Sequence, residues 1–366
     1  MKTKNKKDVI LIKTKKNFFV RKFFQTFFLF SFLFIFSGCG FSGKPDGGVH
    51  KSFDGGKTFQ PKNFVGEKAN IGGVNVLALE IDPLNAETIY IGTEKEGIYR
   101  STDGGEKWVK DINNFQNVTE IVIHPNLSNI IYITAKKAGR GKVLKTTDGG
   151  ENWQEIYTMN VDGPAIVSLA MNKRTPETLY IGTSEGGIFK TTDGGATWKT
   201  LLWEKSSIRK IVIDNANPNI VYFGTVSSGA FLTKDGGTNF SEMKKSGYIY
   251  NIISYPNAEG NLLLSDKDGL QKSNDFGENW QVINTLVKPE KLGTRGLDIN
   301  PNNSNEIFYA SAKAMYKSTN GGETWSAIQF NISRSIELIR INPKDTNIIY
   351  LGMYNRGGTS GIKLLP

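Results

Sequence analysis

The stretch Ser101-Thr102-Asp103-Gly104-Gly105-Glu106-Lys107-Trp108 decides the fold of this chain, because the same pattern of residues occurs six more times. Each copy has Ser or Thr, an Asp or Asn two positions later, one or two Gly, and a final Trp or Phe. The Asp or Asn of the seven copies recurs every 40 to 49 residues, at Asp54, Asp103, Asp148, Asp193, Asp235, Asp275 and Asn320. Self-similarity at such a period indicates a repeat architecture.

A second pattern runs in phase with the first and divides each repeat into four short strands. It is a turn of the Asn-Pro or Asp-Pro kind between two apolar runs, as at Ile81-Asp82-Pro83. In the first complete repeat the predicted strands are Val74–Ile81, Thr88–Thr93, Gly97–Ser101 and Lys107–Asp111. Short strands separated by Gly, Asn, Asp and Pro favour a propeller blade, and the 3.6-residue periodicity of helical repeats is absent. The sequence predicts an all-β, seven-bladed β-propeller of four-stranded blades.

The sequence predicts that residues from the N-terminal end of the chain complete the last blade. The first motif precedes the first complete repeat, and the last pair of strands follows the last motif. We therefore expect the segment His50–Phe64 to complete the blade that begins near Ile336, which would hide open sheet edges. Both His50–Phe53 and Gly361–Leu364 fit the third strand of that blade, and the sequence does not choose between them.

The N-terminus has the pattern of a secretory signal. A basic run to Lys22 precedes the apolar stretch Phe23–Phe36, which is short for a membrane-spanning helix. The segment Phe36-Ser37-Gly38-Cys39 resembles the bacterial lipobox, with Phe36 where Leu is usual. The resemblance implies a lipidated Cys39 as the new N-terminus; an ordinary signal peptide or signal anchor is the alternative.

These features predict the domain organisation and the location. We expect a signal peptide at 1–38, a tether at 39–48 and the propeller at 49–366. The protein would be exported and anchored in the membrane through Cys39, at the outer membrane, on the periplasmic face or on the cell surface.

Composition excludes several kinds of partner. The chain has 366 residues, 45 Lys and Arg against 35 Asp and Glu, and a formal charge of +10. Nine of the basic residues and one acid lie in 1–38, so the remainder is nearly neutral at 36 against 34, which argues against nucleic acid. One Cys and two His argue against a disulfide framework or a metal centre. With no phosphate-binding or dinucleotide motif, we expect neither cofactor nor metal.

The repeated motif is predicted to be structural. Its Asp accepts backbone N–H groups of its own turn, its Gly residues take positive φ, and its aromatic side chain is buried. The amide of Asn320 keeps the hydrogen bonds but removes a charge, which disfavours calcium binding or acid catalysis. The motif is identified as the Asp-box, or BNR repeat, and the chain resembles that superfamily over 50–366. The resemblance implies that the turn joins strands three and four, away from the usual binding face.

Polar residues at the start of the first strands are the candidate binding residues. Counted back from the turn, positions one and three are apolar in most repeats, as in Leu79 and Ile81, whereas positions four and five are polar. We expect these polar residues to ring the mouth of the central channel: Thr119, Glu120, Arg209, Lys210, Tyr250, Asn251, Arg295 and Glu337, joined by Lys136, Lys137, Arg140 and Arg356 from loops. Solvated strand ends are the alternative interpretation.

An enzymatic function is one open hypothesis. Sialidases share the Asp-box, but their Arg-Ile-Pro motif is absent here. The segment Gly186–Trp198 is similar to segments of xyloglucan-cleaving enzymes, which use carboxylates from two facing propellers. Such chemistry needs a general acid and a second carboxylate at a defined separation. Glu120 and Glu337 are the candidates.

A binding function is the other hypothesis, and the one we favour. A single exported seven-bladed propeller resembles the photosystem II stability and assembly factors, which implies docking onto a protein client through a basic patch. The residues in question are Arg140, Arg209, Lys210 and Arg295. Sortilin-like sorting-receptor propellers share the repeat and bind peptides. We expect a non-catalytic binding or scaffold module for a protein or polysaccharide partner, with a glycoside hydrolase, sialidase-like or xyloglucanase-like, as the alternative.

Overall fold

The computed structural model describes residues 46–67, 69–113, 115–245, 247–287 and 296–356. The chain divides into two units, Met1–Lys44 and Pro45–Pro366, and every described residue belongs to the second. The signal segment, Cys39 and Gly361–Leu364 lie outside the described residues. Across the described ranges no helix is long and apolar enough to span a membrane.

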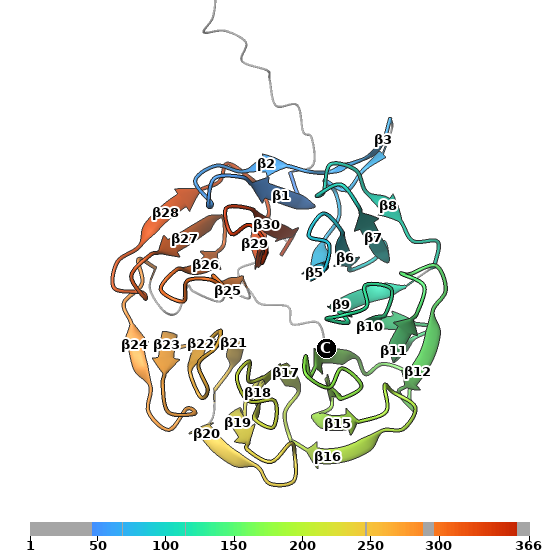
Figure 1. The fold of residues 1–366 in the computed structure, drawn as a ribbon, viewed down its shortest axis with the longest axis vertical. Coiled ribbons are helices and arrows are strands. Elements are labelled where there is room, and N and C mark those ends of the chain that lie inside the picture. Colours follow the sequence, from blue (N-terminus) through green and yellow to red (C-terminus); the bar gives the residue numbers. More distant parts are fainter. Residues whose placement is uncertain (1–45, 68, 114, 246, 288–295, 357–366) are drawn as a thin grey trace, which may run out of the picture. The chain divides into compact units, whose positions relative to one another are not determined.

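Seven four-stranded antiparallel sheets form a ring, which confirms the predicted seven-bladed propeller (Figure 1). Six sheets use four consecutive strands each. The first three are β5 (Val76–Ile81), β6 (Ile89–Thr93), β7 (Ile98–Ser101) and β8 (Val109–Lys110); β9 (Gln116–Ile123), β10 (Ile131–Lys137), β11 (Arg140–Thr146) and β12 (Gln154–Thr158); and β13 (Ile166–Met171), β14 (Leu179–Thr183), β15 (Gly187–Thr191) and β16 (Lys199–Trp203).

The next three sheets continue around the ring. They are β17 (Ile208–Ile213), β18 (Val221–Thr225), β19 (Gly229–Thr233) and β20 (Ser241–Lys245); β21 (Ile249–Ser254), β22 (Leu262–Asp266), β23 (Gly269–Ser273) and β24 (Gln281–Ile283); and β25 (Leu297–Ile299), β26 (Ile307–Ser311), β27 (Ala314–Ser318) and β28 (Ser326–Gln329). In each blade the first strand lies nearest the centre and the fourth at the rim (Figure 1). The strands predicted for the first complete repeat agree with β5 to β8 within two residues at each end.

The N-terminal segment closes the ring. Strand β1 (Val49–Ser52) pairs antiparallel with β30 (Ile349–Tyr354), which pairs with the innermost strand β29 (Ser335–Ile341). Strand β2 (Gln60–Pro61) is the outer strand of this closing blade, so blue and red strands share one sheet in Figure 1. The third-strand place that the sequence left open is therefore occupied by β1. A small hairpin of β3 (Phe64–Gly66) and β4 (Ala69–Asn70) follows.

The hydrophobic core lies between neighbouring blades. One cluster joins Tyr90 and Ile98 of the first complete blade to Ile121 and Ile133 of the next. The closing blade is joined in the same way, since Val49 and Tyr350 belong to one cluster with Trp108. Burial of apolar area is thus the main force that holds one blade to the next.

The Asp-box caps the turn between strands three and four with hydrogen bonds. Ser101 Oγ donates to Asp103 Oδ1 at 2.7 Å and accepts the Gly105 N–H at 2.8 Å. The Lys107 N–H donates to Asp103 Oδ1 at 2.9 Å, and Gly104 and Gly105 have φ of 70° and 91°. Burial opposes ionisation of Asp103, but its hydrogen bonds hold its pKa below the usual value.

The amide of the seventh copy makes the same contacts as a carboxylate. Asn320 Oδ1 accepts from Ser318 Oγ and from the Thr324 N–H, both at 2.9 Å. We therefore expect Asp103→Asn to keep most of the stability, whereas Asp103→Ala lowers the free energy of unfolding by about 1 kcal/mol, the typical value of a lost capping side chain. Urea unfolding of both variants measures the difference. Equal losses would contradict a hydrogen-bonding role for Asp103.

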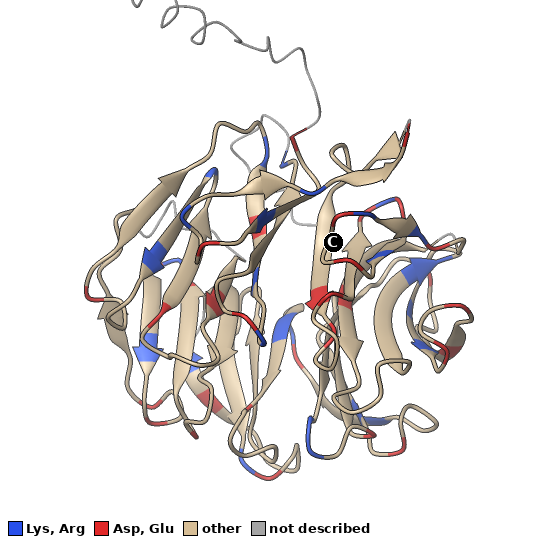
Figure 2. Ribbon diagram, turned by 45° about the horizontal axis from the view of Figure 1, so that its top comes forward, with Lys and Arg blue, Asp and Glu red and all other residues tan. Residues whose placement is uncertain are grey.

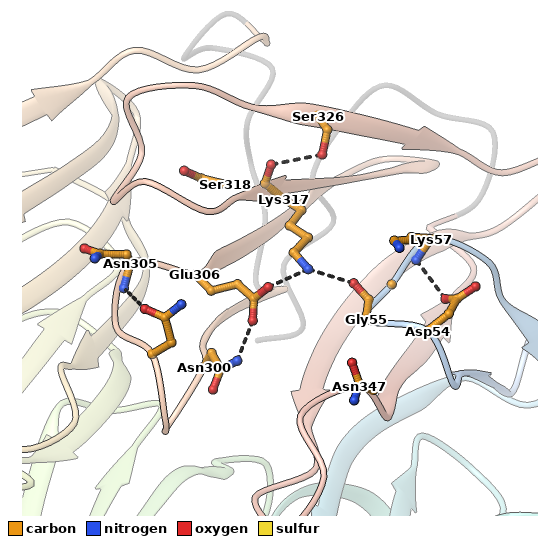
Figure 3. Close-up of polar contacts among 12 residues, drawn as sticks. Asp54, Gly55, Lys57, Asn300, Asn305, Glu306, Lys317, Ser318, Ser326 and Asn347 are labelled. Carbon is orange, nitrogen blue, oxygen red and sulfur yellow. Dashed lines mark hydrogen bonds and ion pairs between the residues drawn. The ribbon is translucent and has the colours of Figure 1, made fainter.

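Most of the Asp-boxes also bond their blade to the preceding one. The carbonyl oxygen of Gly104 accepts from Tyr350 Oη at 3.1 Å and from Lys51 Nζ at 2.9 Å, both in the closing blade. Figure 3 shows the same arrangement between the closing blade and the β25–β28 blade that precedes it. There Lys317 Nζ donates to the Gly55 carbonyl at 3.0 Å. Lys317 also pairs with Glu306 at 2.5 Å.

The indole of the motif completes this connection. Trp108 Nε1–H donates to the Lys62 carbonyl at 2.8 Å, and Trp198 Nε1–H donates to the Ile156 carbonyl at 3.1 Å. In both cases the acceptor lies on or next to the outer strand of the preceding blade. These contacts account for the motif by structure alone.

We expect His50 to make the folding of the closing strand sensitive to acid. Burial lowers the pKa of His50 from 6.5 to about 4, with Asp46 opposing the shift. Because the folded state favours the neutral imidazole, the unfolded chain binds the proton first as the pH falls. We expect His50 to reduce the free energy of unfolding by about 3 kcal/mol between pH 6.5 and 4, with no further His50-dependent loss below that range.

Substitution of this residue tests the assignment. His50→Leu should flatten the pH dependence of unfolding between pH 6.5 and 4, measured by urea unfolding at a series of pH values. If His50 were not the titrating group, the free energy of unfolding would change with pH equally in the unchanged chain and in the variant.

Candidate functional site

The inner strands surround a cavity of about 330 Å³ in the central channel. The Asp-box turns and the turns between strands one and two share one rim, because the Gly104 N–H donates to the Glu87 carbonyl. The opposite rim holds the starts of β9, β17 and β21 and the end of β10; we call it the channel mouth. Seven of the predicted binding residues line the cavity there: Thr119, Glu120, Lys136, Arg209, Lys210, Tyr250 and Asn251.

Two of these residues neutralise each other across the channel. Lys210 Nζ on β17 lies 2.7 Å from Glu120 Oε1 on β9. The two strands belong to the blades on either side of the β13 blade, so the ion pair reaches past one intervening blade. Both side chains are largely buried, and neither charge is left for a partner at the mouth.

A cationic and aromatic group lies beside this ion pair. The guanidinium of Arg209 is 6.0 Å from the ring centroid of Tyr248, and the rings of Tyr248 and Tyr250 are 4.7 Å apart. Lys136, at the end of β10, lines the same cavity. Within the described ranges, neither Arg209 nor Lys136 has a carboxylate within ion-pair distance. The channel mouth therefore has two cations that no acidic side chain of the described ranges neutralises.

The other predicted binding residues that the structure describes do not line this cavity. Glu337 on β29 is buried and its Oε2 accepts from Arg356 Nη2 at 2.7 Å. Arg140 begins β11 on an exposed hairpin and pairs with Asp162 at 2.8 Å. Arg295 lies outside the described residues. The Asp-box residues Asp54, Asp148, Asp193, Asp235 and Asp275 make the turn contacts described for Asp103, on the opposite rim.

Three charged residues deeper in the channel were not predicted. Asp298 on β25 and Arg340 on β29 line the cavity, and Glu80 on β5 lies next to Arg340. Arg340 Nε lies 3.7 Å from Glu80 Oε2. Asp298 accepts the N–H groups of Ile299 and Ile341, each at 3.0 Å. Burial raises the pKa of Glu80 and of Asp298, and Arg340 opposes both shifts.

The sequence contains a pattern from which these three residues could have been predicted. Each lies two positions before its turn residue, where the other four blades have Val122, Ala170, Val212 and Ile253. Charged residues at a position that is otherwise small and apolar mark the channel interior. The prediction considered only positions four and five. In Figure 2 charges of both signs are interspersed over the ribbon, in agreement with a nearly neutral propeller.

The described part of the chain brings together no group of three or more His, Cys, Asp or Glu side chains with the spacing of metal ligands. The side chains at the channel mouth offer ion pairing, a cation beside an aromatic ring and contact between two tyrosine rings.

Comparison with known proteins places this geometry in a family. The family described as "Sortilin, neurotensin receptor 3" (Sortilin-Vps10) matches residues 47–185 and 141–272. A probable oligoxyloglucan-reducing end-specific xyloglucanase of Neosartorya fischeri is 28% identical over 93 residues, which is 24% of this chain and 11% of that protein.

Solved structures share the fold at low identity. The GH74 enzyme of Niastella koreensis has a TM-score of 0.62 at 19% identity, covering 76% of this chain and 51% of that one. YCF48 from Cyanidioschyzon merolae has a TM-score of 0.59 at 15% identity, covering 76% and 95%. YCF48 bound to a D1 peptide has a TM-score of 0.56 at 19% identity, covering 76% and 93%. The chain thus spans about half the length of the GH74 enzyme and nearly all of YCF48.

Proposed function

We propose that this chain, which belongs to the Sortilin-Vps10 family of Asp-box propellers, is a non-catalytic binding module that holds a segment of a protein partner at its channel mouth. It would act in the cell envelope, anchored through Cys39. The observation that carries the proposal is that two cations, Arg209 and Lys136, line the cavity at the channel mouth together with Tyr250, whose ring is tilted against that of Tyr248.

The charges at the mouth favour an anionic segment. The charges of Glu120 and Lys210 cancel each other within the channel, and the charge of Glu337 is neutralised by Arg356. Arg209 and Lys136 then set the sign of the local potential, which steers and orients a partner of opposite charge. Arg and Tyr are also the residue types most enriched at the centres of interfaces. The peptide-bound YCF48 structure supports a peptide as the occupant.

A glycoside hydrolase remains the second candidate because of one observation. Glu80 and Asp298 lie in the channel with raised pKa values, as expected of a general acid. Against this, Glu80 faces Arg340 and Asp298 accepts two backbone N–H groups. The carboxylates predicted from sequence, Glu120 and Glu337, are both held in ion pairs.

Affinity recovery of the tagged full-length chain from cross-linked native membranes tests the choice. We expect a specific envelope protein to be recovered, and no release of reducing sugar when the purified chain is incubated with xyloglucan. Recovery of polysaccharide alone, with sugar release abolished by Glu80→Gln or Asp298→Asn, would overturn the proposal and favour the hydrolase.

A further inference from the structure

The chain enters the propeller at the rim of the channel mouth. Strand β1 ends at Ser52, which belongs to the first Asp-box, so the other end of β1 lies on the rim of the channel mouth. Asp46 is fixed there, because its Oδ1 accepts from Ser333 Oγ at 2.7 Å. The Gly47 N–H donates to the Gly72 carbonyl at 2.8 Å. Ser333 precedes β29 and Gly72 precedes β5, and both are first strands, which start on this rim.

Few residues separate this entry point from Cys39. Residues 40–45 alone lie between Cys39 and Asp46. An extended chain covers at most about 3.6 Å per residue, so the connection from Cys39 to Asp46 reaches no further than about 25 Å. Strand β5 (Val76–Ile81) alone spans about 20 Å, and turns extend each blade at both ends. A lipid on Cys39 therefore holds the rim of the channel mouth nearer to the membrane than the Asp-box rim.

Large apolar side chains are exposed on the rim of the channel mouth. Each lies at the end of an outer strand or in the connection that follows it, and each is more than half exposed: Ile112, Val161, Trp203 and Leu286. The ring of Trp203 is held edge-on against Phe189, with the ring centroids 5.9 Å apart. Trp is enriched where a protein meets the headgroups of a bilayer, and buried apolar area gives such a contact its affinity.

The Asp-box rim is less suited to a membrane surface. Six of its seven Asp-box turns carry a carboxylate, and hydrogen bonds within the turns lower the pKa of Asp148 and of Asp275 to about 2. These side chains are ionised at neutral pH, and moving an ionised carboxylate toward hydrocarbon is costly.

Charge does not select the lipid at the rim of the channel mouth. Ion pairs such as Arg140 with Asp162 and Lys267 with Asp268 cancel charge there. Apolar contact, and not attraction to anionic lipid, is therefore the force that we expect to hold this rim to a bilayer. A zwitterionic lipid surface is sufficient for such a contact.

We propose that the rim of the channel mouth rests on the membrane that holds the lipid of Cys39, with Ile112, Val161, Trp203 and Leu286 in the headgroup layer. The channel then opens toward the bilayer, and the segment that it binds lies close to the membrane surface. The inference rests on the proposed function, because it needs the lipid on Cys39. It adds the orientation of the propeller and a second contact surface.

Site-specific fluorescence of the full, lipidated chain in phosphatidylcholine vesicles tests this orientation. Cys39 is the one cysteine of the chain, so an introduced cysteine is labelled alone once Cys39 carries lipid. A nitrobenzoxadiazole label is placed at Ile112→Cys or Val161→Cys and, as matched controls, at Leu84→Cys or Leu127→Cys, which are exposed in turns of the Asp-box rim. Lipid that is spin-labelled near the headgroup should quench the first pair at least about twofold more strongly, because the contact reaches about 5 to 10 Å into the bilayer.

A second comparison separates apolar contact from closeness to the anchor. With the label at Val161→Cys, Ile112→Ser combined with Trp203→Ser should reduce the quenching by about half, whereas Leu84→Ser with Leu127→Ser should not change it. Unchanged quenching in the first double variant, or equal quenching on the two rims of a lipidated chain, would overturn the inference and leave binding at the channel mouth standing. A mass that shows no lipid on Cys39 would overturn the proposed anchoring and the inference together.

Discussion

Replacement of Trp108 by Ala is expected to lower the free energy of unfolding by about 3 to 5 kcal/mol, the usual loss for a fully buried Trp. The indole is completely buried in one cluster with Val49 and Tyr350 of the closing blade. Its Nε1–H donates to the Lys62 carbonyl at 2.8 Å. The substitution therefore leaves a cavity and an unpaired Lys62 carbonyl at the boundary between the β5–β8 blade and the closing blade.

The measurement is urea unfolding followed by far-UV circular dichroism. Trp108→Phe, which retains most of the buried ring, serves as the matched variant and should lose about half as much. Trp325→Ala is a second comparison, since its indole makes the same kind of bond to the Asn284 carbonyl but is only partly buried. A surface substitution usually changes stability by less than about 1 kcal/mol. A loss that small for Trp108→Ala would contradict the view that Trp108 holds the first complete blade against the closing blade.

Charge reversal at the channel mouth has the second large effect. Arg209→Glu combined with Lys136→Glu should weaken the affinity for the recovered protein partner by about 30-fold or more, because truncating central Arg and charged groups commonly costs 2 kcal/mol or above. The loss arises from repulsion of an anionic segment and should shrink as ionic strength rises. Titration calorimetry with the purified partner at low and physiological salt measures the loss of affinity and its dependence on ionic strength.

The matched control changes the charge equally at positions away from the mouth. Lys57 and Lys199 are both exposed. Lys199 lies on the outer strand β16, and Lys57 lies in the Asp-box turn of the closing blade. Lys57→Glu with Lys199→Glu should leave the affinity within about twofold, since exposed charges beyond a Debye length are screened. Equal losses in both double variants would mean that net charge, not the mouth, governs binding.

Much of the fold was predictable because the repeat carries its own structural chemistry. Ser101, Asp103, Gly105 and Trp108 each make a contact that depends on residue type and spacing, so seven copies predict seven turns and seven blades. Closure was only partly predictable. The sequence showed that the N-terminus must join the last blade, but the choice of β1 over Gly361–Leu364 depends on pairing with β30 across the whole chain.

The candidate site was less predictable, since its contacts join residues of different blades. The location of Glu120, Arg209, Lys210 and Tyr250 at the starts of first strands follows from the sequence. The ion pair between Glu120 and Lys210 does not, because it connects residues 90 positions apart through the geometry of the ring.

Photocrosslinking from the channel mouth tests the central claim most directly. A benzoylphenylalanine placed at Tyr250 should, on irradiation of native membranes, form an adduct with one envelope protein through an anionic segment of it. The same residue placed at Ala196, exposed in an Asp-box turn on the opposite rim, should not form that adduct. An adduct of the same protein from Ala196 and none from Tyr250 would contradict binding at the channel mouth.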